Sequence, residues 1–169
     1  MAKMNSGKIF ENNFRLSVPK YAFYYRFKDS ASSYYGGNQF LRFSNTNIAD
    51  NLIFYDGKLY LNELKSHTGK SIPLDCIEGK KNKKEQIRQL TEADEFDNVY
   101  SYIIVYFSDI KRCFALNIKY YNFFKLDYPE KKSIPLDYFE KQATELPITT
   151  IRTNFRVDIE KLFQIIKDQ

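Results

Sequence analysis

The chain has 169 residues, which suits one domain, and its 43% hydrophobic and 28% charged content is typical of a soluble globular protein. Its two cysteines, Cys76 and Cys113, are far apart and form no CxxC pair, which argues against a zinc site or a disulfide framework and predicts a reducing, cytoplasmic location. No apolar run approaches membrane-spanning length, so we expect no membrane partner. The net charge of +5 favours a polyanionic partner, with a merely basic protein as an equal alternative.

The N-terminal part predicts a helix, a strand and a long polar insert. The apolar spacing favours a helix from about Ser6 to Val18, which Pro19 ends. Residues 21–27 form a strongly aromatic strand candidate. Residues 28–47 are rich in Gly, Ser and Asn, and a long insert of this kind in a compact domain is often functional.

A β-hairpin is predicted next. Asp56-Gly57 separates the apolar runs 52–55 and 59–61, and this dipeptide favours a tight turn between antiparallel strands. With these two residues as the loop, Leu52 faces Leu61. The same register continues outward to the open end of the hairpin.

The open end of the hairpin gathers charged side chains. In the predicted register Asp50 faces Glu63, and opposed carboxylates repel each other. Lys65 shares the face of Glu63 because side chains alternate along a strand. Two carboxylates there cost stability unless a cation neutralises them. The pattern therefore predicts a metal site or, equally well, a solvated cross-strand salt bridge.

The rest of the chain predicts a polar loop around His67, a basic cluster at residues 80–84 and further regular elements. These elements are a helix over 83–96, strands over 99–107 and 112–118, a short helix over 119–126, an extended piece over 148–152 and a final helix over 157–166. The order of elements predicts an α/β fold with a mixed central β-sheet flanked by helices.

One short repeat occurs in the chain. The sequence Ser71-Ile-Pro-Leu-Asp75 recurs as Ser133-Ile-Pro-Leu-Asp137. A residue before proline is extended, and proline suits the first turn of a helix. Both copies are therefore interpreted as local helix starts and not as a domain duplication.

The chemistry of the hairpin end suits phosphodiester hydrolysis. Mg²⁺ binds one or two carboxylates and keeps several waters, so Asp50, Glu63 and the Leu64 carbonyl are candidate ligands. Lys65 could orient or deprotonate a water and offset developing charge. The acid-x-lysine pattern alone is weak evidence, because it occurs five times in this chain.

The pattern Asp50-x12-Glu63-x-Lys65 resembles the PD-(D/E)xK nuclease core, and the chain is similar to the RecU-type Holliday junction resolvases of Gram-positive bacteria and their phages. The similarity rests on further segments along most of the chain: Gly7-Lys-Ile-Phe-Glu11, Ser71-Ile-Pro-Leu, Glu85-Gln86-Ile87, Tyr102-Ile-Ile-Val-Tyr-Phe107 and Ser133-Ile-Pro-Leu.

The resemblance implies a homodimeric endodeoxyribonuclease that resolves four-way DNA junctions in recombination and repair, by paired nicks that depend on Mg²⁺ or Mn²⁺. It implies that Asp50, Glu63 and Lys65 are the catalytic acids and lysine, and that Glu11 and Gln86 are accessory active-site residues. It also implies a single nuclease domain over residues 1–169.

The resemblance places the family's junction-binding stalk at residues 28–47. This insert is short and poor in basic residues, and the N-terminal extension common in bacterial members is missing, so we expect a compact phage-type member. The candidate DNA-binding residues are Lys8, Arg26, Lys28, Tyr34, Tyr35, Arg42, Lys81, Lys83 and Lys84. The insert aromatics serve equally well as a dimer core.

Two other functions remain open at this point. One is a restriction or repair endonuclease that cuts duplex DNA with the same core. The other is a non-catalytic DNA-binding module in which the acids serve only structure.

Overall fold

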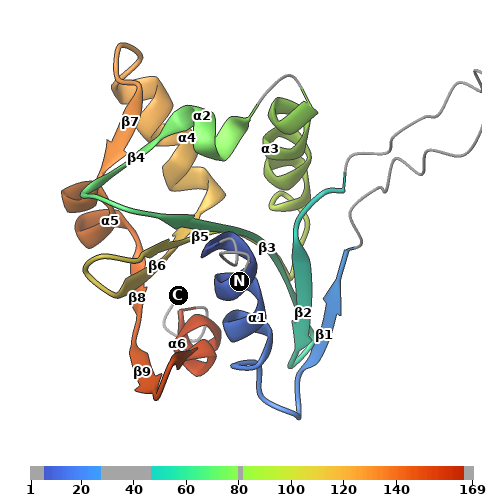
Figure 1. Ribbon diagram of the computed structural model, residues 1–169. Helices are drawn as coiled ribbons and strands as arrows, with labels where there is room; N and C mark the ends of the chain where they lie inside the picture. Colours follow the sequence, from blue (N-terminus) through green and yellow to red (C-terminus); the bar gives the residue numbers. More distant parts are fainter. Residues whose placement is uncertain (1–5, 28–46, 80–81, 166–169) are drawn as a thin grey trace, which may run out of the picture.

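The structure, a computed structural model, describes residues 6–27, 47–79 and 82–165, with the side chains of 82 and 83 left aside. A six-stranded sheet has the order β1-β2-β3-β5-β6-β8 (Figure 1). Only β3 and β5 pair in parallel, so the sheet is mixed, as predicted. The strands are β1 (Phe23–Arg26), β2 (Asn51–Tyr55), β3 (Lys58–His67), β5 (Val99–Phe107), β6 (Arg112–Asn117) and β8 (Thr144–Leu146).

Helices cover both faces of this sheet and divide the core into two clusters. One face carries α2 (Leu74–Glu78), α3 (Asn82–Ala93), α4 (Ile118–Asp127) and α5 (Leu136–Gln142). The opposite face carries α1 (Ser6–Arg15) and α6 (Ile159–Gln164) (Figure 1). Because β5 is central and covered on both faces, every residue from Ser101 to Phe107 is buried, which explains its unbroken apolar run.

The predicted hairpin register is confirmed as far as the strands pair. Leu52 lies opposite Leu61, and the last pair is Asn51 with Asn62. Asp50 lies at a bend beyond that pair, so it is not held directly opposite Glu63 in the ladder.

The predicted loop of His67, Thr68 and Gly69 is confirmed for Thr68 and Gly69 but is wrong for His67. The strand β3 continues to His67, because the long parallel partner β5 pairs with it along its whole length. Pairing with β5 therefore sets where β3 ends, since the polar sequence after Lys65 contains nothing that favours a strand.

The two Ser-Ile-Pro-Leu-Asp copies pair with each other, which the sequence did not predict. They form β4 (Ser71–Pro73) and β7 (Ser133–Pro135), with Ile72 opposite Ile134 and both side chains fully buried. Each copy then starts a helix, α2 or α5, as predicted. The repeat therefore forms a small two-stranded clasp that holds the two helix starts together.

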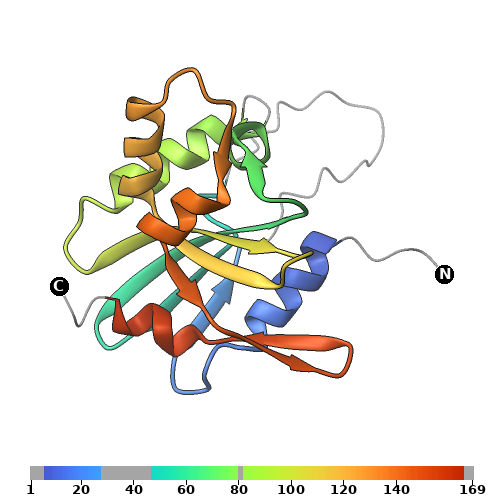
Figure 2. The ribbon, with the colours of Figure 1, turned by 90° about the vertical axis from the view of Figure 1, so that its left-hand side faces the viewer.

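The C-terminal extended piece is one strand of a hairpin formed by β9 (Ile148–Ile151) and β10 (Asn154–Val157). Figure 2 shows this hairpin beside α1. The amides of Phe155 and Val157 donate to Asn13 Oδ1 at 3.2 Å and Ser17 Oγ at 2.9 Å, respectively. Within the described residues, none of the helices is long and apolar enough to cross a membrane.

Candidate active site

Asp50 is fixed where β1, β2 and β3 meet. Its backbone amide donates to the Asn62 carbonyl at 3.1 Å, and its carbonyl accepts from the Phe27 amide at 3.0 Å. Its Oδ2 accepts the Leu64 amide at 2.8 Å. One carboxylate oxygen is therefore hydrogen-bonded to the backbone of β3. This bond orients the other oxygen without the help of a charged side chain.

Glu63 is a buried carboxylate with two side-chain partners. It is 1% exposed, its Oε1 pairs with Lys65 Nζ, and its Oε2 accepts from Gln86 Nε2 at 2.6 Å. Gln86, on α3, is 6% exposed. A buried carboxylate is expensive unless it is paired and hydrogen-bonded, so this network offsets the desolvation of Glu63.

The available donors suit a hard divalent cation. Asp50 and Glu63 supply carboxylate oxygens, and the residue after Glu63 supplies the Leu64 carbonyl. A carboxylate oxygen can accept more than one bond, so Glu63 can take a cation while it keeps a hydrogen-bond partner. No group of three Asp, Glu, His or Cys side chains suited to a metal occurs in the described part of the chain. The set therefore fits Mg²⁺ or Mn²⁺, which take few carboxylates, and not an all-protein cage.

Glu11 borders the candidate site through Arg26. It projects from α1, on the other face of the sheet, and pairs with Arg26 at 2.7 Å. Arg26 ends β1 and lies opposite Asn51, the residue after Asp50. The Glu11–Arg26 pair therefore borders the site next to Asp50, whereas Gln86 contacts Glu63 directly.

Two buried asparagines, which were not predicted as site residues, lie in the same place. Asn51 and Asn62 are both fully buried, and Asn62 Nδ2 donates to Asn51 Oδ1 at 3.0 Å. Asn51 Nδ2 and Asn62 Oδ1 have no partner among the described residues. Each asparagine adjoins a predicted catalytic acid within an otherwise apolar strand, and that position was the available signal.

The candidate DNA-binding residues fall into two groups. Lys8 on α1 and Lys84 on α3 are exposed, and Arg26 is half exposed in its pair with Glu11. The others lie outside the described residues or have an undescribed side chain: Lys28, Tyr34, Tyr35, Arg42, Lys81 and Lys83.

The insert begins and ends next to the site. Residues 28–46 connect β1 to its antiparallel neighbour β2, and Phe27, just before them, bonds to Asp50. The described residue before the insert is therefore hydrogen-bonded to Asp50.

Comparison with protein families gives a match to the model described as RecU, Recombination protein U, over residues 40–164. This match spans most of the chain. The chain belongs to the RecU family. A search of curated proteins finds no match.

Membership places this RecU protein in a family of Holliday junction resolvases, which are nucleases that act on branched DNA. The matched residues include Asp50, Glu63, Lys65 and Gln86, and exclude Glu11. The hydrogen-bonded cluster at the hairpin end therefore lies within the matched part of the chain.

Proposed function

We propose that this RecU protein is a metal-dependent endonuclease that resolves four-way DNA junctions by paired nicks, with its active site at the open end of the β2–β3 hairpin. The observation that carries the proposal is the buried Glu63 carboxylate, held between Lys65 and Gln86 within a family of resolvases. The site would belong to a PD-(D/E)xK core in a single domain over residues 1–169.

Asp50, Glu63 and the Leu64 carbonyl would hold Mg²⁺ or Mn²⁺, which supplies charge to a phosphate oxygen and lowers the pKa of a bound water. Lys65 is 12% exposed, so its ammonium lies in a partly desolvated place where it can orient a water or a phosphate oxygen. Gln86 keeps the Glu63 carboxylate in place through its 2.6 Å bond. Glu11 would act as an accessory active-site acid, and its ion pair with Arg26 places it at the border of the site.

DNA would approach over the edge where the insert begins and ends. Arg26 ends β1 at that edge, and the exposed Lys8 on α1 and Lys84 on α3 are further candidate phosphate contacts. Residues 28–47 would form the part that enters the junction. The paired nicks require two active sites, which a homodimer supplies. A cytoplasmic phage-type enzyme of recombination and repair fits this activity.

The test is the Asp50→Asn variant. We expect it to lose cleavage by at least about a hundredfold while it binds junctions as tightly as the wild type or more tightly, because one negative charge near the phosphate is removed. The amide retains an oxygen for the Leu64 N–H. Cleavage at the wild-type rate would remove Asp50 from the mechanism.

The non-catalytic alternative predicts a different result in the same experiment. A protein that only binds DNA would show tight junction binding and no cleavage in Mg²⁺ or Mn²⁺, for the wild type as well as for Asp50→Asn.

Deletion of residues 30–43 distinguishes the two proposed roles of the insert, which are junction binding and dimer formation. Weaker junction binding by a folded dimer supports a stalk, whereas loss of the dimer assigns the insert to the interface.

A further inference from the structure

A cavity of about 290 Å³ lies on the sheet face opposite Glu63, between α1, the ends of β3 and β5, and the β9–β10 hairpin. Ser66, which follows Lys65 directly, and its register partner Tyr106 both line it. Side chains alternate across a strand, so the cavity begins one residue beyond the candidate active site, on the other face. The carboxyl ends of neighbouring parallel strands are a common place for ligands.

The inner wall of the cavity is aromatic. Tyr106 lies with its ring centroid 5.4 Å from that of Phe10 and 4.6 Å from that of Phe155. Phe10 is buried, but Phe155 is only half buried and presents part of its ring to the cavity. Such a wall suits a flat apolar group, and nucleic-acid bases stack on aromatic side chains of this kind.

The Tyr106 hydroxyl lacks a partner. Tyr106 is 9% exposed as a whole residue, and its hydroxyl forms no hydrogen bond within the described part of the chain, but it is not among the polar atoms that are cut off from solvent. Burial raises the pKa of this phenol, so it stays protonated and can donate. A hydroxyl donor on the wall of an open cavity is available to a ligand.

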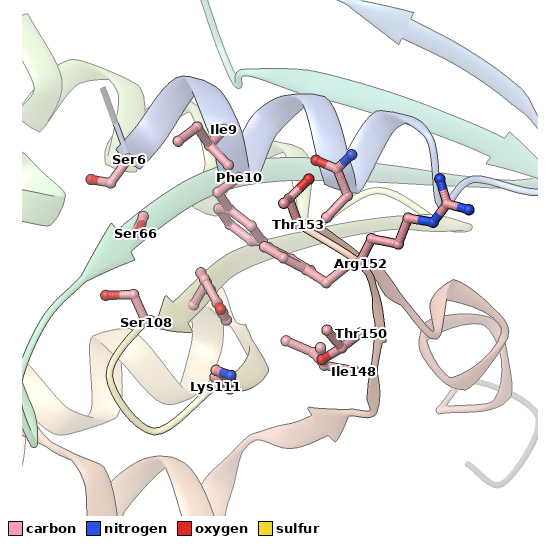
Figure 3. Close-up of a pocket in the computed structure, with 13 residues that line it drawn as sticks. Ser6, Ile9, Phe10, Ser66, Ser108, Lys111, Ile148, Thr150, Arg152 and Thr153 are labelled. Carbon is pink, nitrogen blue, oxygen red and sulfur yellow. The ribbon is translucent and has the colours of Figure 1, made fainter. Parts of the chain in front are cut away.

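The rim of the cavity is cationic. Lys111 and Arg152 line it and form no ion pair with any described residue, and no carboxylate lines it. Figure 3 shows Lys111 and Thr150 across the cavity from Ser6 and Ile9, while the Arg152 guanidinium extends outward along α1. The positive charge of Lys111, together with the hydroxyl groups that line the same cavity, suits a phosphate.

We propose that this cavity binds one unpaired nucleotide of the DNA substrate, with the base against the Phe155 ring, within reach of the Tyr106 hydroxyl, and its phosphate at Lys111. Its volume lies at the lower end of that of small-ligand sites, which suits one nucleotide and not a longer segment. The proposal rests on the proposed DNA substrate and adds a preference to it: a strand cut near Lys65 continues around the sheet end and places a nearby unpaired nucleotide in the cavity.

The test compares two four-way junctions without divalent cation, so that cutting does not interfere. One has a single unpaired 2-aminopurine at the crossover, and the other is fully paired. We expect the wild-type chain to bind the first about tenfold more tightly and to quench the 2-aminopurine as the base stacks. Equal affinity for both junctions would overturn the proposal.

Variants locate the effect. Lys111→Gln should lose most of the tenfold preference, and Tyr106→Phe should reduce it about threefold, since only a hydroxyl without a protein partner is removed. Lys141→Gln is the matched control: it removes the same charge from an exposed position on α5, on the opposite face. A preference that survives in both Lys111→Gln and Tyr106→Phe would contradict the assignment.

Two further outcomes separate this proposal from others. Displacement of the 2-aminopurine junction by millimolar deoxyadenosine monophosphate as readily as by single-stranded DNA would identify a free nucleotide as the ligand and overturn the strand assignment. Cleavage of junctions by a wild-type chain with no preference for the unpaired base would leave the proposed function standing and remove the cavity from it. Quenching of 2-aminopurine by a chain that cleaves no junction in any metal would leave the nucleotide cavity standing and remove the proposed nuclease function.

Discussion

The strands β3 and β5 carry two different polar environments on their two faces. On one face the Glu63 carboxylate is almost fully buried and bonded to both Lys65 and Gln86. On the other face, three residues further along the same strands, the Tyr106 hydroxyl makes no hydrogen bond within the described part of the chain. Within the protein the first group is satisfied, and the second is not. The comparison indicates that the first site is preorganised, whereas the second leaves a hydroxyl available to solvent or to a ligand.

The strongest test of this contrast is removal of one partner of Glu63. Lys65→Ala leaves a buried carboxylate without its counter-charge, so we expect a loss of about 3–5 kcal/mol in the free energy of unfolding, together with loss of cleavage. Chemical denaturation and a junction-cleavage assay measure the two effects.

The control variant replaces both members of the Glu63–Lys65 ion pair and not only one of them. Glu63→Gln combined with Lys65→Met removes both charges, and we expect its stability to equal or exceed that of the wild type while cleavage stays absent. A double variant as unstable as Lys65→Ala would show that the charges themselves hold this part of the fold.

Two tyrosines provide a matched comparison of satisfied and unsatisfied hydroxyls. Tyr121 is fully buried and its hydroxyl donates to Glu78 at 2.7 Å, whereas Tyr106 has no such partner. Tyr121→Phe should cost about 1.5–3 kcal/mol of unfolding free energy, and Tyr106→Phe should cost less than about 0.5 kcal/mol. A similar loss in both variants would mean that the Tyr106 hydroxyl has a structural role.

The Tyr121 effect should also depend on pH. Burial opposes ionisation of Glu78, but the hydrogen bonds from Lys125 and Tyr121 outweigh it and hold its pKa below the usual value. The folded carboxylate therefore stabilises the protein above the unfolded pKa, and this contribution is lost as pH falls through the lower folded pKa. Denaturation at pH 7 and at pH 3 should show a smaller difference between Tyr121→Phe and the wild type at the lower pH. A constant difference would contradict this role of Glu78.

The smallest effect on stability is expected at the border of the active site. Arg26 and Glu11 are partly exposed, and such pairs contribute at most about 1 kcal/mol, so Arg26→Gln should leave unfolding unchanged within that limit. If Arg26 contacts a phosphate, the slope of log binding constant against log salt should fall by about one. An unchanged slope would remove Arg26 from the DNA-binding surface, and Lys141→Gln serves again as the control.

The sequence predicted the parts of the fold that depend on local pattern. Asp56-Gly57 fixed the hairpin register as far as Asn51 and Asn62, and the apolar run 99–107 gave its strand to the residue. The extension of β3 to His67 was missed because β5 supplies the pairing, and the clasp of β4 with β7 because the pairing joins segments about sixty residues apart.

The candidate site was predicted only in part, because some of its contacts depend on local pattern and others join distant segments. The grouping of Asp50, Glu63, Leu64 and Lys65 follows from one hairpin, and Gln86 was placed by resemblance. The bond from Leu64 to Asp50, the pairing of Glu11 with Arg26 and the aromatic cavity around Tyr106 each join elements distant in the chain. Such contacts depend on how helices and hairpins pack on the sheet, which no local pattern reveals.

The most direct measurement is the cleavage of an immobile four-way junction and of a linear duplex of the same sequence, by the wild-type chain in Mg²⁺ and in Mn²⁺. We expect paired nicks in the junction and little or no cutting of the duplex, with both products absent for Asp50→Asn. Equal cutting of the two substrates would contradict junction resolution and indicate a duplex endonuclease, and no cutting of either in both metals would contradict a nuclease site at the β2–β3 hairpin.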